Sequence, residues 1–112
     1  MDEATATAVS AGDEAAAVFG ALADPVRRAL LARIAAAPAT ATELAGGLPI
    51  SRQAVAKHLS ALSDAGLLER RRCGRDVRYL VTPEPLEDAV SWIARVGGQW
   101  DERLSRLARE LG

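Results

Sequence analysis

Apolar residues recur along this chain at two spacings: three or four residues apart over most of its length, and every second residue in one stretch after Gly66. The first spacing places apolar side chains on one face of a helix, and the second is typical of a strand. The pattern predicts a mainly α-helical domain of about five helices with a two-stranded β-hairpin. Residues 1–13 carry no sustained apolar stripe, so we expect a disordered tail ahead of a single domain over residues 14–112.

Two helices are predicted in the first third of the chain. The first begins at Glu14 and the second at Pro25. Asp24 can accept hydrogen bonds from free backbone N–H groups, and Pro at the first helical position gives up an N–H that has no partner. The second helix should end near Pro38. The apolar positions expected to face inward are Val18, Leu22, Val26, Leu30 and Ile34.

Two further helices follow, separated by a tight turn that contains two glycines. Thr40 and Glu43 have the spacing of a capping box, which predicts a short helix over 41–46. Ser51 is the expected cap of the next helix, and Gly66 is expected to end it in the left-handed conformation. The inward face of this fourth helix is expected to be Val55, Leu59 and Leu62.

A long last helix is predicted from Leu86 to Leu111. Its apolar positions follow alternating steps of four and three residues, with Gly97 at the one gap. A stripe of that length on a terminal helix commonly packs against a partner helix, so we expect a homodimer. The stripe consists of Leu86, Val90, Ile93, Trp100, Leu104, Leu107 and Leu111.

The hairpin is predicted from strands over 67–72 and 77–82, joined by residues 73–76. Five arginines lie within nine residues of this hairpin. A guanidinium on such a hairpin can enter a DNA minor groove or bind phosphates. The five arginines are Arg70, Arg71, Arg72, Arg75 and Arg78, of which Arg71, Arg72, Arg75 and Arg78 are the predicted DNA contacts.

Charge is unevenly distributed, although the whole chain carries only −1. Residues 1–24 carry −5 and residues 81–112 carry −2, whereas residues 25–49 carry +2 and residues 50–80 carry +4. A polyanion responds to the local basic surface within a Debye length and not to the net charge. The centre of the chain therefore favours a nucleic-acid partner.

The third and fourth helices, with the basic hairpin after them, are the parts of a winged helix-turn-helix. In such a fold one helix enters the major groove of duplex DNA, and its exposed side chains reach base edges. The side chains opposite the inward face of the fourth helix are suited to bases and phosphates. They are Ser51, Arg52, Gln53, Ala56, Lys57 and Ser60.

Several segments together resemble the ArsR family of repressors over residues 18–82. They are the stretch Ala21-Leu22-Ala23-Asp24-Pro25-Val26-Arg27-Arg28-Ala29-Leu30-Leu31, then Glu43-Leu44-Ala45, then Ile50 to Leu62 (ISRQAVAKHLSAL), then Ala65-Gly66-Leu67-Leu68 and the Gly74-Arg75 turn. The resemblance implies a dimeric winged-helix repressor of transcription, with a dimer interface made by the first and last helices. Val18 and Leu22 from the first helix join the stripe of the last helix as expected interface residues.

The chain departs from the metal-sensing members of that family. Those members place paired cysteines on the third helix, where this chain has Glu43-Leu44-Ala45-Gly46-Gly47-Leu48, or His and Asp ligands on the last helix, which here has neither His nor Cys. Soft metals need thiolate or imidazole ligands, and His58 and Cys73 are the only candidates. We therefore expect a metal-independent regulator without a cofactor, whose effector the sequence leaves open.

Other classes find less support. One His and one Cys do not supply a nucleophilic triad, and the chain has no phosphate-binding glycine loop, so no enzyme is expected. A single Cys and the absence of a long apolar run predict a cytoplasmic protein. His58 is expected to be packed or to face a phosphate. Cys73 is either incidental or responsive to oxidation, because the arginines around it favour a thiolate, and the role of Trp92 stays open. The alternative function is a winged helix that binds an acidic protein, which salt-dependent binding to duplex DNA would distinguish.

Overall fold

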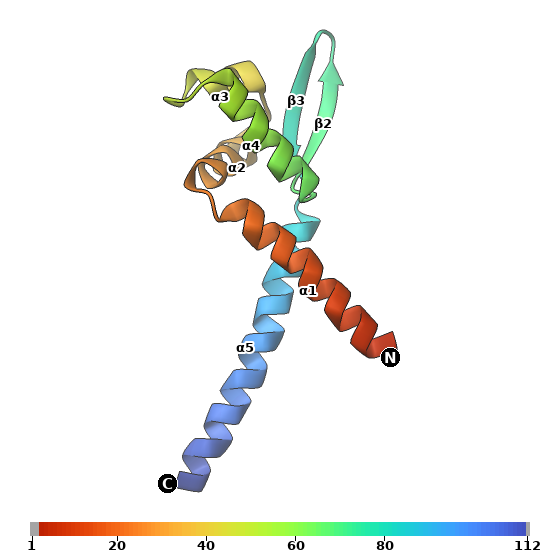
Figure 1. The fold of residues 1–112 in the computed structure, drawn as a ribbon, viewed down its shortest axis with the longest axis vertical. Coiled ribbons are helices and arrows are strands. Elements are labelled where there is room, and N and C mark those ends of the chain that lie inside the picture. The colour runs from red at the N-terminus through yellow and green to blue at the C-terminus, as the bar shows by residue number, and fades with distance from the viewer. Residues whose placement is uncertain (1–2, 112) are drawn as a thin grey trace.

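The computed structural model describes residues 3–111, with side chains described for 12–99, 102–103 and 105–110. Over this part the fold is mainly helical with a small antiparallel sheet, as predicted. The elements are α1 (Glu3–Leu22), α2 (Pro25–Ala36), β1 (Ala39–Thr40), α3 (Ala41–Gly46), α4 (Arg52–Asp64), β2 (Leu68–Cys73), β3 (Asp76–Val81) and α5 (Glu84–Leu111). Figure 1 shows α2, α3 and α4 gathered beside the hairpin, while α1 and α5 cross and extend away from them.

The predicted capping residues start three of the helices. Asp24 Oδ1 accepts a hydrogen bond from the backbone N–H of Val26 at 2.8 Å, and so begins α2. Thr40 Oγ1 accepts from Glu43 N at 3.1 Å, and Ser51 Oγ accepts from Ala54 N at 3.1 Å. Each cap satisfies a donor that has no partner inside its own helix, which fixes where the helix begins.

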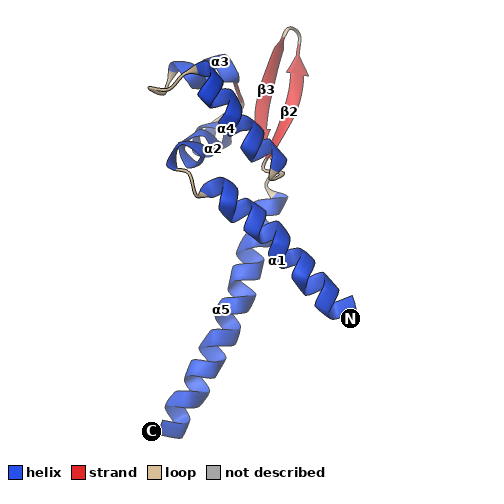
Figure 2. Cartoon of the chain, in the orientation of Figure 1, coloured by secondary structure: helices blue, strands red, loops and turns tan. Residues whose placement is uncertain are grey.

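The hairpin carries a third strand that the sequence did not indicate. The strand order is β1-β3-β2, and β1 pairs with β3 so that Thr40 lies opposite Arg78 (Figure 2). Two residues are too short to show an alternating pattern, so this strand depends on its pairing and not on its own sequence. At the far end Cys73 lies opposite Asp76, and Gly74 takes a φ of 65°, which permits the two-residue turn. We call β2 and β3 together the wing.

The core lies between α1, α2, α3, α4, the base of the wing and the start of α5. The predicted inward positions are confirmed, since Leu30 and Ile34 of α2 and Val55, Leu59 and Leu62 of α4 are buried and Val26 is partly buried against them. Gly66 follows the end of α4 in the left-handed conformation, with a φ of 80°, also as predicted. The most deeply buried side chains are Leu30, Ile34, Leu44, Val55, Leu59, Leu62 and Leu67. Removing such apolar area from water is the main favourable contribution to folding.

Two expectations for α1 are corrected. The helix begins at Glu3 and not at Glu14, so residues 3–13, expected as a disordered tail, are helical. This segment contains four alanines, which have the highest helix propensity, and helix propensity does not require an apolar stripe. Val18 was expected in a dimer interface, but only 2% of its surface is exposed within one chain. It belongs to the core of the protomer and has almost no surface left to bury.

Candidate nucleic-acid interface

The turn between α3 and α4 is shaped by Arg33 of α2. Its Nη1 donates a hydrogen bond to the carbonyl of Leu44 at 3.2 Å, which satisfies a carbonyl near the end of α3. Gly47 makes this contact possible, because a Cβ at that position would overlap the Arg33 guanidinium. The short helix α3 is thereby held against α2, and α4 leaves the turn at a fixed position.

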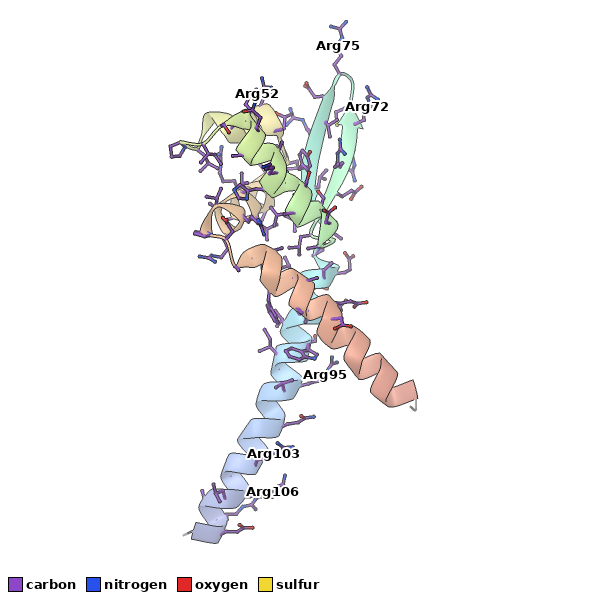
Figure 3. The ribbon with its side chains drawn as sticks, viewed as in Figure 1. Arg52, Arg72, Arg75, Arg95, Arg103 and Arg106 are labelled. Atoms are coloured by element: carbon purple, nitrogen blue, oxygen red, sulfur yellow. The ribbon has the colours of Figure 1, made fainter. Side chains whose placement is uncertain are left out.

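Helix α4 is divided into a buried face and an exposed face. Val55, Leu59 and Leu62 are buried against the core, and the N-terminal cap Ser51 sets the first turn. The six side chains that the sequence assigned to DNA contact are all exposed: Ser51, Arg52, Gln53, Ala56, Lys57 and Ser60. Arg52 lies at the same end of the molecule as the wing arginines Arg72 and Arg75, as Figure 3 shows. The exposed basic side chains of α4 and of the wing therefore lie at the same end of the molecule, and we call them together the basic surface.

The arginines of the wing have different surroundings. Arg72 and Arg75 are exposed, and Arg75 projects from the turn at the tip (Figure 3). Arg71 is also exposed and lies 3.4 Å from the carboxylate of Glu69. Arg70 was expected only to add charge, but its guanidinium lies 6.0 Å from the centre of the Tyr79 ring, a cation–π geometry. Arg70 and Arg71 are therefore engaged by neighbouring side chains, whereas Arg72 and Arg75 lie exposed nearer the tip of the wing.

Two residues of α3, Thr42 and Glu43, bind arginines of the basic surface. Neither residue was assigned to the site from the sequence. Thr42 Oγ1 accepts a hydrogen bond from Arg52 Nη2 at 2.8 Å. Glu43 Oε1 forms an ion pair with Arg78 Nη1 at 3.1 Å. The sequence indicated Glu43 as the second half of a capping box, and its carboxylate instead contacts the wing. No local signal would have shown this, because both contacts join segments that are distant in the chain.

His58 lies on the half-buried side of α4, where it contacts α2. Its Nδ1 accepts a hydrogen bond from Arg27 Nε at 3.3 Å, which agrees with the packed role expected from the sequence. Asp24 lies in the same cluster. Burial acts to raise the pKa of Asp24, but hydrogen bonds from the backbone of Arg27 and Val26, with the nearby His58 and Arg27 side chains, lower this pKa below its ordinary value.

An apolar surface runs along α5, away from the basic surface. Val90 is 65% exposed, Ile93 49% and Leu107 50%, although each belongs to the predicted stripe. Phe19 of α1 is 40% exposed and its ring lies 6.3 Å from that of Trp92, a contact that the sequence did not indicate. Leu22 and Leu86 are partly buried against the core. Three further stripe residues, Trp100, Leu104 and Leu111, have side chains outside the described residues.

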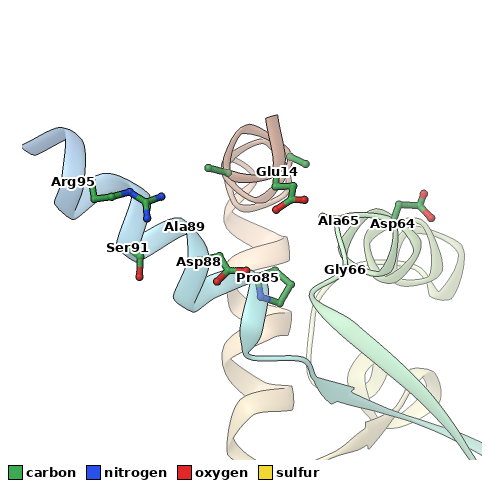
Figure 4. Close-up of a pocket in the computed structure, with 11 residues that line it drawn as sticks. Glu14, Asp64, Ala65, Gly66, Pro85, Asp88, Ala89, Ser91 and Arg95 are labelled. Carbon is green, nitrogen blue, oxygen red and sulfur yellow. The ribbon is translucent and has the colours of Figure 1, made fainter. Parts of the chain in front are cut away.

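A cavity of about 660 Å³ opens between α1, the end of α4 and the start of α5 (Figure 4). Glu14, Asp64 and Asp88 contribute carboxylates to its rim, and Arg95 lies at one end.

Among the residues that the structure describes, no three His, Cys, Asp or Glu side chains gather closely enough to hold a metal ion. The thiol of Cys73 is free and exposed beside the turn of the wing. Within the same part of the chain, no helix is long and apolar enough to cross a membrane.

Comparison with known proteins places the same elements in regulators of transcription. A helix-turn-helix domain family matches residues 22–71. The transcriptional repressor SdpR of Bacillus subtilis is 29% identical over 87 residues, which span 78% of this chain and 97% of that protein. An ArsR-like transcriptional regulator from Rhodococcus sp. RHA1 is 40% identical, with a TM-score of 0.82 over 87% of this chain and 92% of its own.

A third similar protein bears on assembly. The solution structure of a homodimeric winged helix-turn-helix DNA-binding domain from Mycobacterium bovis, a possible ArsR-family regulator, is 26% identical. Its TM-score is 0.66, and the match covers 95% of this chain and 93% of that one. The winged helix-turn-helix architecture predicted from the sequence is thus confirmed by these structures.

Proposed function

The chain belongs to the ArsR family of winged helix-turn-helix transcriptional regulators, and on this premise we propose that it is a repressor that binds a palindromic operator as a homodimer. The observation that carries the proposal is the single basic surface formed by the exposed face of α4 and the tip of the wing. Helix α4 enters the major groove, and the wing binds the adjacent backbone or minor groove.

The residues of α4 divide into base contacts and phosphate contacts. Arg52 and Gln53 have side chains that pair with guanine and adenine edges, and Ala56 is small enough for a thymine methyl group. Lys57, Ser51 and Ser60 are suited to phosphates or mixed contacts. Arg71, Arg72 and Arg75 of the wing add attraction that does not depend on sequence, and Arg78 joins them when it leaves Glu43.

The exposed apolar positions of α5 support a dimer. Val90, Ile93 and Leu107 lose contact with water when a second copy of α5 packs on the same stripe, with Leu22 and Leu86 at its edge. The proposed interface also includes Trp100, Leu104 and Leu111. The two copies of α4 then lie about 34–36 Å apart in successive major grooves, so the operator is an imperfect palindrome. Occupancy of such a site in a promoter blocks polymerase.

Selection of bound fragments from genomic DNA tests the proposal directly. The expected result is a small set of promoter fragments that share an inverted repeat, with binding that weakens as salt is raised. Retardation of no fragment at low ionic strength would refute DNA binding and favour the alternative, a winged helix that binds an acidic protein.

A further inference from the structure

We propose that the first turn of α3 sets two properties of DNA binding, the discrimination between sequences through Thr42 and the overall affinity through Glu43, although both side chains act through neighbouring arginines and not on the DNA. Thr42 positions Arg52, and Glu43 restrains Arg78. The inference rests on the proposed DNA binding and extends it to two residues outside α4 and the wing.

Thr42 acts on the base-contacting side of the surface. Arg52 is the first residue of α4 and is exposed, so its long side chain would sample many rotamers if nothing held it. The 2.8 Å hydrogen bond to Thr42 Oγ1 holds the guanidinium in one orientation before DNA arrives. A guanidinium that is already held in one orientation loses less side-chain entropy when it binds, and its N–H donors match one base edge better than others. Thr42 therefore strengthens binding to the matching sequence only.

Glu43 acts on the phosphate-contacting side. Thr40 pairs with Arg78 across β1 and β3, and Glu43, three residues later in α3, reaches the same arginine at 3.1 Å. Both side chains remain partly exposed, at 51% for Glu43 and 37% for Arg78, so the ion pair can be broken by a competing anion. Its carboxylate neutralises one cation of the wing. Glu43 therefore weakens binding to every sequence by about the same factor.

The two effects act on different quantities. Discrimination is the affinity for the matching sequence divided by the affinity for unrelated duplex. Thr42 raises this ratio by raising its numerator, whereas Glu43 lowers both affinities by the same factor, because a phosphate contact adds the same free energy to both complexes. One turn of a six-residue helix thus holds one arginine from each DNA-binding element.

The test uses the full chain and two duplexes of equal length and composition: a fragment recovered by the genomic selection and a scrambled version of it. Thr42→Val should weaken binding to the recovered fragment about three- to tenfold and leave the scrambled duplex unchanged, with Thr42→Ser restoring the wild-type value. Glu43→Gln should strengthen binding to both duplexes by the same factor, about three- to tenfold, and steepen the salt dependence by about one phosphate contact.

Controls separate the routes of action. In an Arg78→Gln background, Glu43→Gln should change little, since the double-mutant cycle isolates the pair. Glu87→Gln, which removes an acid from α5, should leave both affinities unchanged. If the wild type discriminates normally, an unaltered ratio of affinities in Thr42→Val together with unaltered affinities in Glu43→Gln overturns this inference alone. Failure of the wild type to bind either duplex overturns the proposed function, and this inference with it.

Discussion

Arg27 Nε donates a hydrogen bond to His58 Nδ1 at 3.3 Å, and this contact joins α2 to the helix that carries the proposed DNA contacts. Arg27 is also one of the two residues whose backbone N–H groups donate to Asp24 Oδ1. The start of α2, its cap and the inner side of α4 therefore form one polar cluster beside the apolar core. The charge of Asp24 is part of what holds this cluster together.

Asp24 should make stability depend on acid pH. Because its folded-state pKa is lowered, the ionised carboxylate adds stability at pH values above the unfolded pKa of about 3.9, and this contribution is lost as pH falls through the folded value. Asp24→Asn keeps a capping oxygen and removes the charge. Urea unfolding should show the wild type more stable than Asp24→Asn at pH 7, with the difference disappearing under strongly acidic conditions. An equal difference at both pH values would contradict this role.

Gly74 should be sensitive to replacement because its φ of 65° suits glycine. Gly74→Ala forces a Cβ into the left-handed region and should lower the free energy of unfolding by about 1–2 kcal/mol. Gly98→Ala is the matched control, since a Cβ there meets nothing within 4 Å in the middle of α5. That change should instead stabilise the helix, by up to about 1 kcal/mol. Chemical denaturation of the two variants should give shifts of opposite sign.

Gln53 should affect binding in a way that depends on the DNA sequence. It is exposed near the start of α4, and Gln can form two hydrogen bonds with adenine. Gln53→Ala should weaken binding to the recovered fragment by about 1–3 kcal/mol and relax the preference at one or two base pairs. Titrations against fragments with single base-pair changes measure this. A uniform loss over all fragments would instead assign Gln53 to the backbone.

Arg75 should affect all sequences alike. It projects from the tip of the wing, where no described side chain forms an ion pair or hydrogen bond with it, and it is suited to phosphate contact (Figure 3). Arg75→Ala should weaken binding to matched and scrambled duplexes equally and reduce the salt slope by about one. Arg106→Ala removes the same charge from α5, far from the wing, and should leave the slope unchanged. Loss of sequence preference in Arg75→Ala would place this arginine on base edges.

Leu107 should be required for the dimer. It is 50% exposed in one chain and lies on the apolar stripe of α5. Leu107→Glu places a charge in the proposed interface and should give monomers in analytical ultracentrifugation, together with a loss of DNA affinity. Ser105→Glu adds the same charge to an exposed position off the stripe and should remain dimeric. A fully dimeric Leu107→Glu variant would show that the subunits associate through another surface.

Features encoded over a few neighbouring residues could be predicted from the sequence. The caps Asp24, Thr40 and Ser51 start helices where expected, because each depends on hydrogen bonds within three residues. The faces of α2 and α4 followed from periodicity alone. The six candidate DNA contacts on α4 lie on the exposed side for the same reason, since the buried positions leave no other side for them.

Features that depend on distant pairing could not be predicted. Strand β1 exists because it meets β3, and the contacts of Glu43 with Arg78 and of Thr42 with Arg52 depend on where α3 lies in space. The burial of Val18 likewise reflects the crossing of α1 over α5, which an apolar pattern does not reveal. Periodicity identifies an apolar face, but it does not say whether the same chain or a second copy covers that face.

Because α4 is anchored from one side by Val55, Leu59 and Leu62, the opposite side is free to vary without cost to the core. If α4 reads DNA as proposed, substitutions among its solvent-facing positions other than the cap Ser51 change which operator is preferred while the fold keeps its stability. Target choice and foldability are therefore separable in this scaffold, and a duplicated copy could acquire a new set of promoters through a few changes on one helix.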